Sequence, residues 1–215
     1  MPLVTELYRS QLDRLPKSGN HIVAQYDAQS IVVYQAYRPA IGHFAAANGY
    51  FGGEFKFERM SWIKPNFLWM MYRSSWGTKE GQEVTLAIWL DRSAFEEILA
   101  AAVHSKFLPE IYTSESEWKT AVRRSPVRLQ WDPDRHPSGT RLSRRAIQLG
   151  LRGKVLATYA KDWIVRIEDI SDFVRQQRQN IASECINLVT PRETVYPVRD
   201  PNIAKKLGLS ENTCW

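Results

Sequence analysis

The stretch Trp62-Ile63-Lys64-Pro65-Asn66-Phe67-Leu68-Trp69-Met70-Met71-Tyr72-Arg73-Ser74-Ser75-Trp76-Gly77-Thr78-Lys79 is the most distinctive part of the chain. It contains three of the eight tryptophans and two of the four methionines. Proline is well tolerated at the first position of a helix, where its missing N–H leaves no hydrogen bond unmade. If a helix begins at Pro65, then Phe67, Met70 and Met71 share one face. The spacing therefore predicts a helix with a buried apolar side.

The opposite side of this predicted helix combines aromatic rings with a cation. Its residues are Trp69, Tyr72, Arg73 and Trp76. Rings stack on flat ligands, and a guanidinium pairs with phosphate or carboxylate, so this side is suited to a flat or anionic ligand. The alternative is a buried helix in which Lys64 and Arg73 only extend their charged ends to solvent.

The composition is that of a globular protein, with 215 residues of which 44% are hydrophobic and 12% aromatic. We predict one globular domain over residues 1–183 and an irregular C-terminal extension over 184–215. The apolar runs are too short to cross a membrane, and the N-terminus lacks the apolar region of a signal peptide, so we expect a cytoplasmic protein. Two cysteines and four unfavourably spaced histidines predict no disulfide framework and no metal site.

Hydrophobic periodicity and turn residues predict an α+β fold, with a central mixed or antiparallel sheet of five or six strands flanked by short helices. The predicted strands are 21–26, 31–37, 84–90, 127–131, 146–149 and 163–167. The predicted helices are 4–15, 39–48, a segment from Asp91 or Ser93 to Val103, 115–124, 153–159 and 169–181. Residues 132–140 are predicted to form a loop, because Asp132-Pro133 is typical of a turn.

A basic segment runs from Arg123 to Lys154, with nine Arg or Lys residues against two aspartates. Such a segment attracts phosphate. The candidate nucleic-acid or phosphate ligands are Arg128, Arg135, Arg144 and Arg145. The alternative is a solvated, arginine-rich surface. Within this segment, His136 beside Asp132 or Asp134 is a candidate general base, and the alternative is a turn capped by the carboxylates.

Five segments together resemble the family known as domain of unknown function 4291. They are YQAY (34–37), WIKPNFLWMMYRSSWGTK (62–79), QWDPDR (130–135), AIQLGL (146–151) and DWIVRIEDI (162–170). The resemblance extends over roughly residues 20–180. It implies no activity, but it implies that the first two segments lie near any site.

A second pattern is similar to the first half of the ADP-ribosyltransferase superfamily: the strand Val33–Tyr37, the helix 39–48 and the turn 49–51. This resemblance implies an ADP-ribosyltransferase-like fold and NAD as cofactor. Gln35 would take the place of the His or Arg that holds the NAD ribose. Glu168 would stabilise the oxocarbenium ion, or it would be a surface residue before a helix. Mapped in this way, the catalytic candidates are Gln35, Tyr72 and Glu168, and the cofactor-binding candidates are Tyr37, Lys64, Trp69 and Arg73.

The sequence thus predicts a nucleotide-dependent enzyme, with ADP-ribosyl transfer from NAD, or related chemistry, on a nucleotide or nucleic-acid acceptor. The alternative is a non-catalytic protein that binds RNA or another single-stranded nucleic acid. In that case residues 123–154 would contact phosphates, and the tryptophans would stack on unpaired bases.

Overall fold

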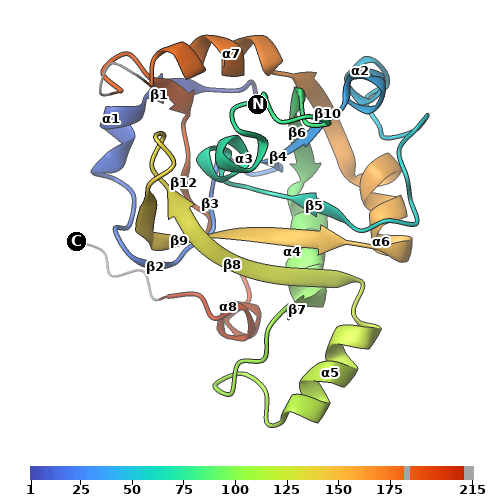
Figure 1. Cartoon of the computed structure of the whole chain (residues 1–215). Coiled ribbons are helices and arrows are strands. Elements are labelled where there is room, and N and C mark those ends of the chain that lie inside the picture. The colour runs from blue at the N-terminus through green and yellow to red at the C-terminus, as the bar shows by residue number, and fades with distance from the viewer. Residues whose placement is uncertain (182–184, 211–215) are drawn as a thin grey trace.

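The computed structural model describes residues 1–181 and 185–210 of the chain (Figure 1). In chain order the elements are β1 (Thr5–Leu7), α1 (Tyr8–Leu12), β2 (Gly19–Asn20), β3 (Val23–Ala24), β4 (Ser30–Tyr37), α2 (Pro39–Asn48), β5 (Ser61–Ile63), α3 (Phe67–Ser74), β6 (Val84–Asp91), α4 (Arg92–Ala101), β7 (Ala102–His104), α5 (Glu115–Arg124), β8 (Val127–Arg135), β9 (Arg141–Leu151), α6 (Gly153–Thr158), η1 (Tyr159–Trp163, a π-helix), β10 (Ile164–Asp169), α7 (Ser171–Gln179), β11 (Val189–Pro191), β12 (Thr194–Val195) and α8 (Pro201–Leu207). None of these helices has the length and apolar character needed to cross a lipid bilayer.

A three-stranded antiparallel sheet has the order β10-β6-β4, and its strands β6 and β4 are largely buried on both faces, whereas most residues of the edge strand β10 are exposed or half-buried. Its middle strand β6 has a continuous run of apolar residues, as expected of a strand covered on both sides. One face packs into a core with α2 and α4, through residues such as Leu86 and Ile88. The other face carries Ala87 and Trp89 and packs against α3 and α7. The sheet therefore separates two hydrophobic cores.

The second sheet has the order β2-β9-β8-β7, and β5 also pairs with β9. Its long strands β8 and β9 form an antiparallel pair that crosses the molecule (Figure 1). Leu129, Leu149 and Leu151 from these strands belong to the same core as Leu86 and Ile88, so the two sheets share one hydrophobic interior. The predicted α+β class with a mixed sheet of five strands is confirmed, and the other strands form the three-stranded sheet and two two-stranded sheets, β1-β11 and β12-β3.

Several of the predicted elements are confirmed. Helix α2 begins at Pro39 and ends before Gly49, which has a left-handed conformation with φ of 76°. Asp91 caps α4, because its side chain accepts hydrogen bonds from the N–H groups of Ser93 and Ala94. The central position of β6 is also confirmed.

The predicted start of the aromatic helix at Pro65 is wrong by two residues. Helix α3 begins at Phe67, because the Asn66 side chain accepts a hydrogen bond of 2.7 Å from the N–H of Trp69 and so caps the first turn. The predicted apolar face is confirmed, since Phe67, Met70 and Met71 are buried. Trp69 is buried as well, so the apolar surface extends further around the helix than the spacing indicates.

The predicted loop over 132–140 is also wrong, because β8 continues to Arg135. Asp132 pairs with Ala146, and Pro133 pairs with Arg145. A register shift follows between Pro133 and Arg135, and such a bulge is where a strand tolerates a residue without an N–H. The turn between the two strands is therefore only about five residues long, from 136 to 140.

The C-terminal extension, predicted to be irregular, is regular over much of its described part. Strand β11 pairs with β1, strand β12 pairs with β3, and α8 packs against α4 and β7. Glu193, Tyr196 and Leu207 are buried there. Strands of two or three residues are too short to show a hydrophobic period, which is why the sequence pattern fades although the segment is folded.

Candidate functional site

A cavity of about 590 Å³ lies where β4, β5, α3, β8 and β9 meet. Its lining is mainly polar and includes three cations, one carboxylate and four glutamine side chains. These residues are Arg59, Lys64, Arg73, Asp132, Gln35, Gln82, Gln130 and Gln148. A concave site with converging polar groups is the usual form of a small-molecule site, so this cavity is the candidate functional site.

One wall of the cavity is a hydrogen-bonded network centred on Gln35. Its Nε2 donates to the Ser61 Oγ at 2.8 Å and to the Tyr37 hydroxyl at 2.9 Å. Its Oε1 accepts a bond of 2.7 Å from the buried Tyr159 hydroxyl. The Tyr37 and Ser61 oxygens are themselves 2.5 Å apart. Because the partners come from β4, β5 and η1, the network fixes this wall in a single arrangement.

The strands β8 and β9 contribute Asp132 to the lining, between two glutamine side chains. Gln130 Nε2 donates to Asp132 Oδ1 at 3.0 Å, and Gln148 Nε2 donates to Oδ2 at 2.8 Å. Gln130 and Asp132 are two positions apart on β8, and Gln148 is directly opposite Gln130 on β9. Side chains with this spacing point to the same face of a sheet. The carboxylate is therefore held in a defined orientation.

Lys64 also lines the cavity and is buried, with only 6% of its surface exposed. Its Nζ is 3.4 Å from the Trp62 carbonyl oxygen, which is a long hydrogen bond. Burial, and secondarily the nearby Arg73, lowers the pKa of Lys64 to about 7, although Asp132 acts in the opposite direction. A large fraction of the Lys64 amine is therefore neutral near pH 7.

The local backbone explains why this lysine is buried. Ser61, Trp62 and Ile63 pair with β9, and the next residue, Lys64, forms an isolated bridge with Tyr34 of β4. Pro65 and the cap residue Asn66 then turn the chain into α3. Lys64 thus lies at the one described bridge between the strands of the two sheets.

The structure brings together four of the residues that the sequence predicts for the site: Gln35, Tyr37, Lys64 and Arg73 all line the cavity. Gln130, Gln148 and Arg59 line it too and were not predicted. The first two alternate with apolar residues on neighbouring strands, a pattern that becomes informative only once the pairing of β8 with β9 is known. Asp132 was considered in the sequence, but as a partner of His136 and not as part of this cavity.

Tyr72 and Trp69 lie outside this cavity. Their rings stack with centroids 5.5 Å apart, and the Arg135 guanidinium carbon is 3.8 Å from the Tyr72 ring centroid. Tyr72 lines a separate hollow of about 320 Å³ together with His136 and Ser138. Tyr72 and Trp69, which the sequence predicts to stack on a nicotinamide or adenine ring, thus stack on each other, and the Arg135 guanidinium packs on the Tyr72 ring.

Glu168 lies on the opposite face of the sheet from Gln35. In the register of the strands, Glu168 faces Ala87 and Ala87 faces Tyr34, whereas Gln35 faces Leu86. Directly paired residues share a face, and successive residues alternate between faces. Glu168 also forms an ion pair with Arg166. The structure therefore does not bring these two candidate catalytic residues into one site.

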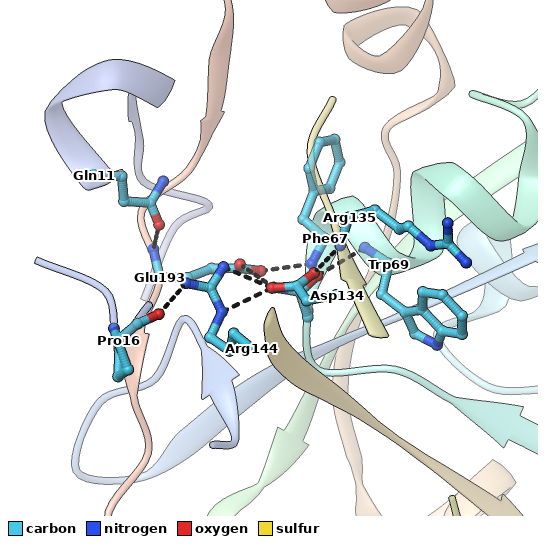
Figure 2. Close-up of polar contacts among 9 residues, drawn as sticks. Gln11, Pro16, Phe67, Trp69, Asp134, Arg135, Arg144 and Glu193 are labelled. Atoms are coloured by element: carbon cyan, nitrogen blue, oxygen red, sulfur yellow. Dashed lines mark hydrogen bonds and ion pairs between the residues drawn. The ribbon is translucent and has the colours of Figure 1, made fainter. Parts of the chain in front are cut away.

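The four candidate phosphate-binding arginines have different environments. Arg144 is buried and binds the Asp134 carboxylate through Nε at 2.8 Å and Nη2 at 2.6 Å, as Figure 2 shows. Arg135 is buried and donates to the Gly139 carbonyl at 3.0 Å. Arg128 donates to the backbone carbonyls of residues 122 and 125. Arg145 is exposed, because successive residues of a strand point to opposite faces and its neighbour Arg144 on β9 is buried.

A family model described as Domain of unknown function (DUF4291) matches residues 21–196, which is most of the chain. The chain belongs to this family. No curated protein matches the sequence. The matched region contains every residue of the cavity described above.

Proposed function

We propose that this DUF4291 member is a nucleotide-dependent enzyme and that the cavity around Lys64 binds the nucleotide. The observation that carries the proposal is the meeting of three cations, one oriented carboxylate and four glutamine side chains in one cavity. Arg59, Arg73 and Lys64 would bind the phosphates. Gln130 and Gln148 would hydrogen-bond the base or the sugar.

The charges of the lining support a phosphate ligand. A guanidinium offers a planar pair of donors that fits two phosphate oxygens, and such charge-assisted bonds are stronger than neutral ones. Arg73 and Arg59 are exposed, so they lie at the open side of the cavity, whereas Lys64 is buried. A nucleotide could therefore place its phosphates between the arginines and the lysine.

The glutamine side chains that line the cavity favour a ligand with hydrogen-bonding groups along one edge. Each glutamine amide has a carbonyl acceptor and two N–H donors, and Asp132 uses one donor of Gln130 and one of Gln148. Hydrogen bonds of this kind recognise a base or a ribose. Within this proposal, the transfer of ADP-ribose from NAD is one possible reaction. In that reaction Asp132, and not Glu168, would be the carboxylate beside the ribosyl cation, because only Asp132 lines the cavity.

The experiment measures thermal stability of the full chain with ATP, GTP, NAD or a short single-stranded RNA. A ligand at a hundred times its dissociation constant stabilises the folded state by about 2.7 kcal/mol. We expect a mononucleotide or NAD to raise the melting temperature. Arg73→Gln should lower the affinity for that ligand by roughly ten- to a hundredfold, because a hydrogen bond to a charged group contributes about 1.5–3 kcal/mol.

Arg175→Gln is the matched control, since Arg175 is an exposed arginine on α7 that pairs with Asp172 and lies outside the cavity. This variant should bind like the wild type. Stabilisation by RNA alone would favour the nucleic-acid-binding alternative. If no nucleotide stabilises the chain, or if Arg73→Gln and Arg175→Gln bind equally well, the proposal is wrong.

A further inference from the structure

We propose that Lys64 is a nucleophile that attacks the α-phosphorus of the bound nucleotide and forms a covalent lysyl nucleotide. The inference rests on the proposed function, because it requires a nucleotide in the cavity. It goes further in naming the reacting atom, the bond that forms and the substrate class, a nucleotide with a phosphoanhydride bond.

The position of Lys64 is unusual for a lysine. It is the one lysine in the described part of the chain that is buried. No carboxylate of residues 1–181 or 185–210 forms an ion pair with it. The buried Arg144, by contrast, is held by a carboxylate and a backbone carbonyl. A buried ammonium without an ion pair is destabilising, so a purely structural role does not explain Lys64.

The surroundings of Lys64 suit a reactive amine. It lies in a cavity, and burial and the Arg73 charge lower its pKa to about 7. Lysines are activated as nucleophiles in this way, by desolvation and by a neighbouring cation. The same cation that disfavours the ammonium form would also bind the phosphate that the amine attacks, so that Arg73 serves both purposes.

The chemical step is a substitution at phosphorus. The lone pair of the neutral Nζ forms a P–N bond with the α-phosphorus, and the P–O bond to the leaving group breaks with its electron pair on that oxygen. The leaving group is pyrophosphate from a nucleoside triphosphate or nicotinamide mononucleotide from NAD. The nitrogen then loses a proton, which we assign to the Asp132 carboxylate, since it lines the same cavity and is oriented by its two glutamine partners.

The test looks for the adduct by intact-mass spectrometry. The full chain is incubated with ATP, GTP or NAD in a magnesium-containing buffer, because phosphoryl transfer from nucleotides generally uses this ion. We expect a mass increase of one nucleoside monophosphate on Lys64, which peptide mapping locates. The bond should be cleaved by acid and survive alkali, as expected of a phosphoramidate.

Lys64→Arg keeps the positive charge but cannot act as a nucleophile, because a guanidinium does not lose its proton in proteins. We expect it to bind the nucleotide without forming the adduct. Lys64→Met is the second variant, in case arginine does not fit the buried position. Lys119→Arg is the matched control, since Lys119 is an exposed lysine on α5 and should leave the adduct unchanged.

The outcomes separate this inference from the proposed function. An adduct that persists in Lys64→Arg or Lys64→Met overturns the inference. So does a nucleotide that stabilises the wild type without forming any adduct, and in that case the proposed function stands. If no nucleotide binds and no adduct forms, both are wrong.

Discussion

The backbones of Tyr34 and Lys64 exchange two hydrogen bonds. The Tyr34 N–H donates to the Lys64 carbonyl at 2.7 Å, and the Lys64 N–H donates to the Tyr34 carbonyl at 3.2 Å. Gln35 follows directly on β4 and Pro65 follows on the other segment. The bridge thus places the buried lysine next to the glutamine network, and it does so through backbone groups that any substitution other than proline leaves in place.

Replacing Lys64 by Met should change how stability depends on pH. Between about pH 7 and pH 10 the unfolded lysine holds a proton that the folded lysine lacks, so wild-type stability rises with pH in this window by at most about 1.4 kcal/mol per unit. Lys64→Met lacks this dependence. Its advantage over wild type should therefore be greatest below pH 7 and decrease toward pH 10, as measured by urea unfolding.

The control for this prediction is Lys119→Met on the surface of α5. Its difference from wild type should stay nearly constant over the same pH range. A Lys64→Met variant that also differs from wild type by a constant amount would show that the folded lysine titrates normally.

Replacing Arg144 by Met should destabilise the fold strongly, and replacing its neighbour Arg145 should not. Arg144→Met leaves the buried Asp134 carboxylate without its ion-pair partner (Figure 2), and breaking a buried pair typically costs about 3–5 kcal/mol. Arg145→Met changes an exposed side chain, for which about 0.5 kcal/mol is the usual limit. Chemical denaturation measures both. Equal losses in the two variants would contradict the orientation of β9.

Gly42→Ala should destabilise the protein although alanine is the better helix former. A Cβ at this position of α2 would lie 2.4 Å from Val84 Cγ1, and overpacking of this kind costs about 1–3 kcal/mol against a gain of roughly 1 kcal/mol in helix propensity. In a Val84→Gly background, which removes the Val84 Cβ at 2.5 Å from the new Cβ as well as Cγ1, the same change should be neutral or stabilising. A double-mutant cycle by thermal unfolding gives the sign of the coupling, and a stabilising Gly42→Ala in the wild-type chain would contradict the close packing.

Glu193→Ala should loosen the attachment of the C-terminal segment to α3. The Glu193 carboxyl accepts a bond of 2.7 Å from the Phe67 N–H and one of 3.2 Å from the Asn66 side chain (Figure 2). Leaving a buried N–H without an acceptor costs about 1–3 kcal/mol. Glu97→Ala, an exposed change on α4, is the control and should have little effect in the same denaturant titration.

The elements that could be predicted from the sequence are those whose signals are local. Pro39 and Gly49 limit α2, and the apolar run of β6 is long enough to indicate a buried strand. The continuation of β8 through Pro133 could not be predicted, because an Asp-Pro pair is typical of a turn and only pairing with β9 extends the strand. Signals such as a proline, a glycine or an apolar run predict a single helix or strand, but they do not predict which strand it pairs with.

Some residues of the candidate site could be predicted from the sequence in the same way, and others could not. Gln35, Tyr37, Lys64 and Arg73 could be chosen from the sequence because they lie in two unusual segments. Their companions Gln130 and Gln148 could not be chosen, since their importance comes from facing one carboxylate across two strands. The assignment of Glu168 to the same site is wrong, because Glu168 and Gln35 point to opposite faces of the sheet. This follows from how the strands pair, and the spacing of residues in the sequence does not reveal it.

The pairing of β1 with β11 bears on how the protein forms during synthesis. Thr5–Leu7 is synthesised long before its partner Val189–Pro191, which lies more than 180 positions further along the chain. The early strand must therefore wait, without this partner, until Val189–Pro191 has been translated. Contacts so distant along the chain slow folding and leave nascent chains open to association with one another.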